Sequence, residues 1–258
     1  MVGERDGHTC DQRRRPTVPA YPDPTRPDVG AALFSTWDVG TPERQRAAVE
    51  AIATTWGERP WPTPELQTYT VYAGTDGRTL LHHSQWTSQE AYEDFVRDHR
   101  QERNDEIDAA VPGIERVELV RTRLYRSFPP VREGERPEPG CIVIVNVVFE
   151  GPDEARQRAW VDAVCEALAT DEGLPPGGIA AHFHLSFDGT RVVNYAEWES
   201  EQAHIDALRA SGRGIGSTTP QWHRVQNFPG LLSGDDVKRY HLRFAAARPP
   251  EPAGSSAR

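Results

Sequence analysis

The chain has 258 residues, a net charge of −10 and 37% apolar residues. Its length suits one or two globular domains. The negative charge argues against nucleic acid and acidic membranes as partners, because both attract a basic surface. No apolar stretch approaches the roughly 20 residues that a membrane-spanning helix needs. Three scattered cysteines, Cys10, Cys141 and Cys165, have no metal-type spacing. We therefore expect a protein of the reducing cytoplasm.

Composition marks the ends of the chain and one internal stretch as unfolded. Residues 1–30 are polar, rich in proline and arginine, and lack the apolar centre of a signal peptide, so we expect a disordered arm. Residues 248–258 are expected to form a disordered tail. A linker is predicted over residues 128–140, where prolines, glycines and charges alternate. Two folded segments remain, 31–127 and 141–247.

The first segment shows four strand patterns and two helix patterns in chain order. Thr41 can cap the first helix and Pro42 suits its first position. A capping-box pair, Thr87 and Glu90, precedes the second helix. A glycine-containing turn separates the two central strands, which is typical of a hairpin. The predicted strands cover residues 31–39, 66–72, 79–86 and 117–127.

The second segment repeats this order. Its first strand is almost continuously apolar and β-branched, so we expect it to be buried on both faces. Trp160 and Leu168 belong to the apolar stripe of the first helix. The pair Asp188-Gly189 predicts a tight hairpin turn, and Ser200 can cap the second helix. The predicted strands cover residues 141–149, 179–187, 192–198 and 237–245.

The two segments are diverged copies of one unit. Residues 44–51 match 156–163, and residues 81–88 match 193–200, both at an offset of 112. The order β-α-β-β-α-β is that of a ferredoxin-like unit, whose helices cover only one face of the sheet. Two such sheets can cover each other's bare faces. We therefore predict an α+β fold of two tandem ferredoxin-like repeats whose sheets form a barrel-like arrangement.

Each repeat carries the pattern [His/Asn]-x3-Trp-x5-[Tyr/His] around the end of its third strand. Because side chains alternate across a strand, the first polar residue and the tryptophan share a face. Trp stacks on flat rings, Asn can donate a hydrogen bond to a phenolate or ketone oxygen, and His or Tyr can move a proton. The residues are His82, Trp86 and Tyr92 in the first repeat, and Asn194, Trp198 and His204 in the second.

This pattern resembles that of the antibiotic biosynthesis monooxygenase family, in the dimeric α/β-barrel superfamily. Its quinone-forming members carry Asn-x3-Trp-x5-Tyr, from which this chain departs at His82 and His204. The resemblance implies oxidation of an aromatic polyketide by O2 without a metal or a tightly bound cofactor. The fused layout is also similar to that of the ring-opening oxygenases of atypical angucycline pathways. That similarity adds oxidative ring opening to hydroxyarene or quinone oxidation as an expected outcome.

We predict that the second repeat holds the working pocket, with Asn194, Trp198 and His204 as catalytic residues. His182 and His184 share one face of the neighbouring strand by the two-residue period, and are expected to line this pocket. The segment 212–230 is expected to be a flexible loop that roofs it. The substrate-binding candidates are His182, His184, Trp86, Tyr92, His82, Tyr72 and Trp222.

Two other classes of function stay open. His182 and His184, with Glu197 as the nearest carboxylate, suggest a metal-dependent dioxygenase or lyase of the vicinal-oxygen-chelate type, although no complete ligand set is visible and no metal is expected. A non-catalytic polyketide-binding or cyclase-helper protein is the other alternative.

The expected partners are a small aromatic polyketide and O2. The sequence has no GxGxxG after a strand and no phosphate-binding loop, so no tightly bound cofactor is expected. Reduced flavin or a hydroquinone is the candidate diffusible electron source, which would add a flavin reductase as a partner. A homodimer is an alternative to a barrel formed within one chain.

Overall fold

The computed structural model describes residues 21–129, 137–171, 173–211 and 216–249. The predicted arm, linker and tail fall largely outside these residues. Each half of the chain runs β-α-β-β-α-α-β. The first half consists of β1 (Ala31–Asp38), α1 (Pro42–Glu58), β2 (Leu66–Gly74), β3 (Thr79–Trp86), α2 (Gln89–Asp98), α3 (Arg100–Ala110) and β4 (Glu115–Phe128). The second half consists of β5 (Cys141–Phe149), α4 (Glu154–Thr170), β6 (Gly178–Ser186), β7 (Arg191–Trp198), α5 (Glu201–Ser211), α6 (Pro220–Gln226) and β8 (Leu231–Ala247).

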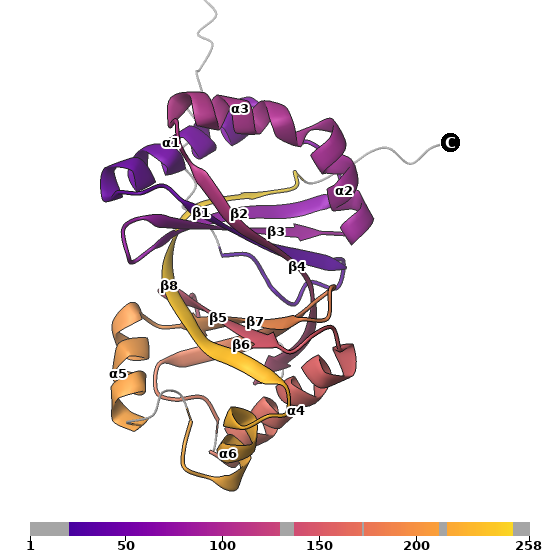
Figure 1. Ribbon diagram of the computed structural model, residues 1–258. Helices are drawn as coiled ribbons and strands as arrows, with labels where there is room; N and C mark the ends of the chain where they lie inside the picture. Colours follow the sequence, from indigo (N-terminus) through magenta and orange to yellow (C-terminus); the bar gives the residue numbers. More distant parts are fainter. Residues whose placement is uncertain (1–20, 130–136, 172, 212–215, 250–258) are drawn as a thin grey trace, which may run out of the picture.

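The eight strands close into one barrel in the order β1-β3-β2-β8-β5-β7-β6-β4. The last strand of each half joins the halves together. Strand β4 pairs with β1 of its own half and with β6 of the other, and β8 pairs with β5 and β2. Figure 1 shows β8, in yellow, passing from the lower half to the upper one. The predicted barrel-like arrangement is confirmed, and its sheets are hydrogen-bonded along both edges.

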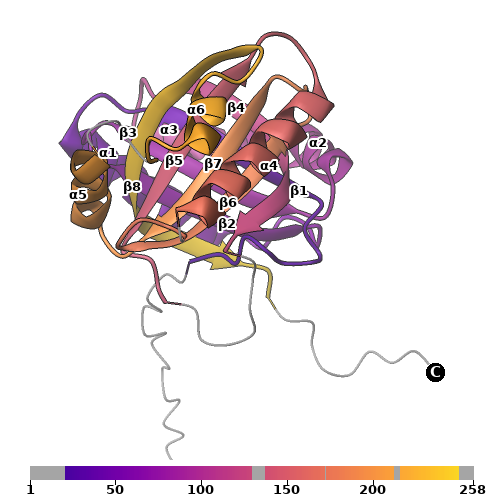
Figure 2. The same cartoon turned by 90° about the horizontal axis from the view of Figure 1, so that it is seen from below.

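Helices cover the outside of the barrel in two layers (Figure 1). Helices α1, α2 and α3 cover the first half, and α4, α5 and α6 cover the second. Figure 2 shows α4 lying across the strands of the second half with α6 beside it. Apolar residues fill three regions: one under each helix layer and one inside the barrel. Among the described residues, no helix is long and apolar enough to cross a membrane.

Equivalent side chains fix the first helix of each half to its hairpin. Thr41 caps α1 and Asp153 caps α4. One turn later, the buried amide of Gln45 donates to the carbonyl oxygens of Gly74 and Thr79. At the matching position in the second half, Gln157 donates to the carbonyl oxygens of Ser186 and Arg191. Because each glutamine satisfies two strand-end carbonyls, the same polar anchor holds both halves.

The C-terminal part of the second half differs from its prediction. The segment 212–230 was expected to be a flexible loop, but residues 220–226 form helix α6, which Thr219 caps and Pro220 begins. Residues 212–215 lie outside the described residues. Strand β8 begins at Leu231 rather than near residue 237, because its first residues already pair with the end of β5. The pairing with β5 holds these residues in a strand that their polar local sequence does not predict.

Candidate functional site

A cavity of about 470 Å³ lies between the barrel wall of the second half and its helices. Valines of β5 form part of its floor, and aromatic and aliphatic residues of α4 and α6 face them. The polar residues on its wall are few. The lining comprises Val143, Val145, Val147, Trp160, Val164, Leu168, Leu174, Pro175, Gly178, Ala180, Ala181, Phe183, Asn194, Ala196, Glu197, Trp198, His204, Leu208, Trp222, Val225, Gln226, Leu231, Gly234 and Val237.

Three residues predicted from the sequence meet in this cavity: Asn194, Trp198 and His204. The two-residue period of β7 places the first two on its helix-facing side. Ser200 accepts a hydrogen bond from the amide of Ala203 at the start of α5, so the helix begins close to the strand end. The His204 ring therefore meets the Trp198 ring edge-on, with centroids 4.8 Å apart. Their catalytic role stays a prediction.

Arg239 of β8 sets the chemical state of His204. Its Nε donates to Nδ1 of His204 over 2.9 Å. Burial, helped by the positive charge of Arg239, lowers the pKa of His204 to about 4. The imidazole is therefore neutral at pH 7, and because Nδ1 accepts, the proton sits on Nε2. In this state His204 is a hydrogen-bond donor toward a ligand rather than a base.

Two further polar atoms on the cavity wall have no hydrogen-bond partner in the part of the chain that the structure describes. They are Oδ1 of Asn194 and Nε1 of Trp160, both buried. Buried polar groups are rarely left unpaired, because each costs about 1–3 kcal/mol. A ligand that carries both a donor and an acceptor could pair with them. The sequence interpretation treated Trp160 only as a core residue. Its alignment with the small Ala48 of the first repeat was the available signal.

His182 and His184 do not line this cavity, contrary to expectation. The pairing of β6 with β7 places Phe183 opposite Asn194 and His182 opposite Tyr195. Directly opposed residues share a face, so both histidines project into the barrel interior. The two-residue period showed correctly that they share a face. It could not show which face, since that depends on the register between strands.

Inside the barrel, His182 lies between two polar side chains. Its Nδ1 is 2.8 Å from Oγ of Ser127 on β4, and its Nε2 is 3.7 Å from Oε2 of Glu197. Nδ1 of His184 is 3.0 Å from the carbonyl oxygen of His182. Among the described residues, no group of three or more His, Cys, Asp or Glu side chains is arranged to hold a metal ion.

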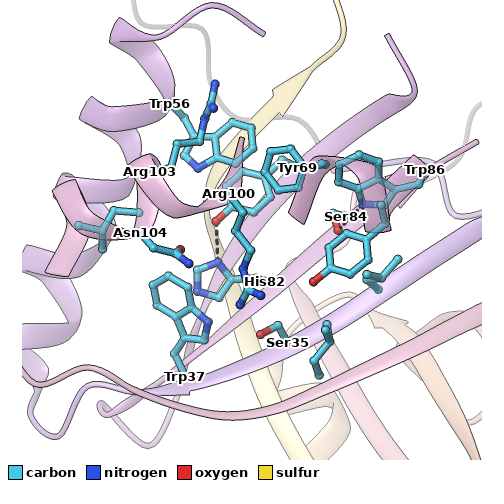
Figure 3. A pocket seen from close by; sticks show the side chains of 15 residues that line it. Ser35, Trp37, Trp56, Tyr69, His82, Ser84, Trp86, Arg100, Arg103 and Asn104 are labelled. Atoms are coloured by element: carbon cyan, nitrogen blue, oxygen red, sulfur yellow. Dashed lines mark hydrogen bonds between the residues drawn. The ribbon is translucent and has the colours of Figure 1, made fainter. Parts of the chain in front are cut away.

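The remaining candidates fall into three places. Trp222 of α6 lines the second-half cavity and forms part of its roof. Tyr72 lies in the barrel interior, where its hydroxyl is 2.9 Å from that of Tyr195. A separate and smaller cavity of about 80 Å³ in the first half (Figure 3) holds the others, His82, Trp86 and Tyr92. The structure therefore does not gather all the predicted binding residues at one site.

The architecture defines the class of the protein: a fused pair of ferredoxin-like units that share one closed barrel, with a separate cavity under each helix layer. No family model matches the chain. The similar proteins agree with the resemblance stated from the sequence: a curated monooxygenase matches part of the chain, and solved structures share its fold.

One curated relative matches part of the chain. Over 78 residues, the chain is 41% identical to tetracenomycin-F1 monooxygenase of Streptomyces glaucescens. The match covers 30% of this chain and 66% of the relative, just under two thirds of its length.

Two solved structures match almost the whole fold. An anthrone oxidase-like protein is 19% identical, with a TM-score of 0.60 over 86% of this chain and 94% of its own. A protein of Lactobacillus acidophilus, provisionally described as a monooxygenase, is 8% identical, with a TM-score of 0.52 over 84% of this chain and 96% of its own. At these identities, the likeness establishes the fold alone.

Proposed function

We propose that the chain is an oxygenase that oxidises a polycyclic aromatic polyketide with O2 in the second-half cavity. The observation that carries this proposal is the convergence of Asn194, Trp198 and His204 on one apolar cavity of about 470 Å³. That volume lies in the range of small-molecule sites, which combine apolar walls with a few placed polar groups. The names of the partial relative, a monooxygenase, and of the anthrone oxidase-like neighbour support the same reaction class.

The polar groups suit a substrate that becomes an anion. A hydroxyarene with an acidic ring CH2 beside a ketone can lose this proton to water before it enters the cavity. The resulting electron-rich anion can transfer an electron to O2. The Nε2–H of His204 would donate to the ketone oxygen, where the negative charge gathers, and Asn194 would bind a neighbouring hydroxyl or oxygen. Trp198 would stack along the rings. The apolar walls exclude water from the carbanion and from the peroxide that follows.

Electron balance favours quinone formation without an added reductant. Conversion of a ring CH2 to a ketone releases four electrons. O2 takes up four electrons when one atom becomes the ketone oxygen and the other becomes water. A flavin, a hydroquinone or a flavin reductase is then not needed, whereas hydroxylation of an aromatic C–H would require two electrons from such a source. We therefore propose a cofactor-independent quinone-forming reaction, with ring opening as the alternative outcome.

Oxygen uptake with a tricyclic hydroxyanthrone tests the proposal. We expect one O2 to be consumed for each quinone formed, with no added flavin or reductant and no loss of rate after treatment with EDTA. The uncatalysed oxidation is subtracted, using the Asn194→Ala/His204→Ala double variant as the protein control. Dependence on reduced flavin would instead indicate hydroxylation. A wild-type rate equal to that of the double variant would refute the assignment of the site.

A further inference from the structure

The first-half cavity has a composition unlike that of the second. Its walls are aromatic, and its polar groups come mainly from strand β3 and helix α3 (Figure 3). Its volume of about 80 Å³ compares with about 470 Å³ for the other cavity. The lining comprises Leu33, Ser35, Trp37, Trp56, Tyr69, His82, Ser84, Trp86, Tyr92, Phe95, Arg100, Arg103, Asn104, Ile107 and Leu119, with no carboxylate.

His82 presents a hydrogen-bond donor there. The Tyr69 hydroxyl lies 2.6 Å from Nδ1 of His82, and the rings of Tyr69 and Trp56 stack with centroids 4.0 Å apart. We assign the hydroxyl as the donor to Nδ1, because a phenol O–H is a stronger acid than the N–H of a neutral imidazole. The imidazole proton then sits on Nε2, which is buried and has no hydrogen-bond partner among the described residues. His82 itself is 5% exposed.

The other polar groups around His82 also donate. The oxygen of Ser84 accepts from the indole N–H of Trp86, which leaves its own proton free to point elsewhere. Arg103 is not one of these donors, because its guanidinium lies over the Trp56 ring (Figure 3) and donates to the carbonyl oxygen of Pro60. Figure 3 shows Arg100 and Asn104 reaching from α3 toward the His82 ring.

The positive charge at this cavity is not cancelled by nearby acids. Arg100 forms no ion pair with any residue that the structure describes. The carboxylates of Glu102 and Glu106 on the same helix bind Arg59 instead. Burial lowers the pKa of His82 to about 3, and the positive charges of Arg116 and Arg100 add to this effect.

We propose that the first-half cavity is a second ligand site, separate from the oxygenation cavity, that binds a carboxylate-sized planar oxyanion between His82 and Arg100. A carboxylate accepts hydrogen bonds and donates none, which matches a set of donors without an acceptor partner. Its charge would balance Arg100, which forms no ion pair with a described residue. The cavity can hold a group of about three or four heavy atoms. It is too small for fused rings, because a cavity that binds even one benzene has a volume of about 150 Å³.

Titration with acetate, followed by the NMR signals of the 15N-labelled His82 ring in the full chain, tests this site. We expect saturable shifts with a dissociation constant of about 1–10 mM, the range open to so small a ligand. Acetamide has the same shape without the charge, so its dissociation constant should be at least tenfold higher. Phenylacetate distinguishes two sources: tighter binding than acetate indicates the acid group of a larger molecule, and weaker binding indicates a free small anion.

Matched variants separate this site from general charge effects. Arg100→Gln should weaken acetate binding by about 10-fold or more, the scale of one charge-assisted hydrogen bond. Arg46→Gln removes the same charge from an exposed position on α1 and should leave binding unchanged. Asn194→Ala should also leave it unchanged, so the result does not depend on the proposed oxygenase activity. Equal titration by acetate and acetamide, equal effects of the two arginine variants, or no saturable shift below about 100 mM acetate would overturn the proposal.

Discussion

The Nε of Arg239 on β8 lies 2.9 Å from Nδ1 of His204 on α5 and donates a hydrogen bond to it. This bond joins the last strand to the helix that covers the second-half cavity. It also decides which nitrogen of His204 carries the proton. The sequence placed His204 in the site but contained no sign of this partner, since 35 residues separate the two.

Replacement of Arg239 by methionine should raise the pKa of His204. The present value of about 4 reflects burial and the charge of Arg239. Without that charge, the pKa should move up toward 6.5 and stay below it, because burial remains. NMR titration of the His204 ring between pH 3 and 8 measures the change. Turnover should fall by about 10–100-fold, as expected when a tautomer is no longer fixed. Arg239→Lys should restore part of both properties, whereas an unchanged pKa in Arg239→Met would contradict the assigned role.

Asn194→Ala should lower kcat/KM for the hydroxyanthrone by about 10–1,000-fold, the scale of one lost anion-stabilising donor. His204→Ala should cost about 100-fold or more, the scale of losing a donor to the developing oxyanion. The free energy of unfolding should change by less than about 2 kcal/mol in Asn194→Ala, because Oδ1 of Asn194 has no hydrogen-bond partner among the described residues to lose. Steady-state kinetics and urea unfolding measure the two quantities.

The matched variants in the first half are His82→Ala and Tyr92→Phe, which alter the equivalent positions beside the smaller cavity. Their effect on turnover should be smaller than that of Asn194→Ala. If they abolished activity while Asn194→Ala remained active, the oxygenation site would have to be moved to the first half.

Trp160→Phe should weaken substrate binding while sparing the fold. The change removes an indole N–H that has no hydrogen-bond partner within the described ranges, and it keeps an aromatic ring against Phe149 and Phe183. If that N–H binds a substrate oxygen, KM should rise by about 5–10-fold, the worth of one hydrogen bond, with little change in kcat. Steady-state kinetics and thermal unfolding decide the matter. A variant with unchanged KM would show that the substrate leaves this N–H unpaired.

His83→Phe should make the protein more resistant to acid. His83 is fully buried and stacks on Phe34, and neither of its ring nitrogens has a hydrogen-bond partner among the residues that the structure describes. Burial lowers its pKa to about 3. The unfolded chain, with a pKa near 6.5, takes up a proton first as the pH falls, so stability is lost between pH 6.5 and 3. The variant should lose less stability over this pH window. Its free energy of unfolding at pH 7 should be higher by about 0–2 kcal/mol. Urea unfolding at several pH values measures both, and identical pH dependence in the two proteins would count against this reading of His83.

The sequence predicted local features well where one stretch of chain determines them. The first part of the apolar run of β5 is buried on both faces as expected, because Ile144 faces the barrel interior and Val143 faces the cavity. The turn at Gly189 has the positive φ of 74° that its Asp-Gly pair predicts. Asn194, Trp198 and His204 were brought together by simple strand and helix periods.

Features that depend on pairing between distant segments could not be predicted. The faces of His182 and His184 follow from the β6–β7 register, and the Arg239–His204 bond follows from the pairing of β8. Helix α6 was missed although Thr219 and Pro220 gave an ordinary start signal, because the helix is only seven residues long. The strand pairings β4–β6 and β2–β8, which are the two seams that join the halves, leave no pattern in the local sequence.

These seams predict that the two halves unfold together. Each half has its own core under its helices, with Ile52 fully buried in the first and Val161 in the second. Separate domains would unfold separately. Here β4 and β8 each hydrogen-bond to strands of both halves. Unfolding of one half would therefore remove strand partners from the other. Calorimetry should therefore show one transition. Ile52→Ala, at a cost of about 2–5 kcal/mol, and Val161→Ala, at somewhat less, should each shift that whole transition downward. Two transitions, each responding to only one of these substitutions, would show that the seams do not couple the halves.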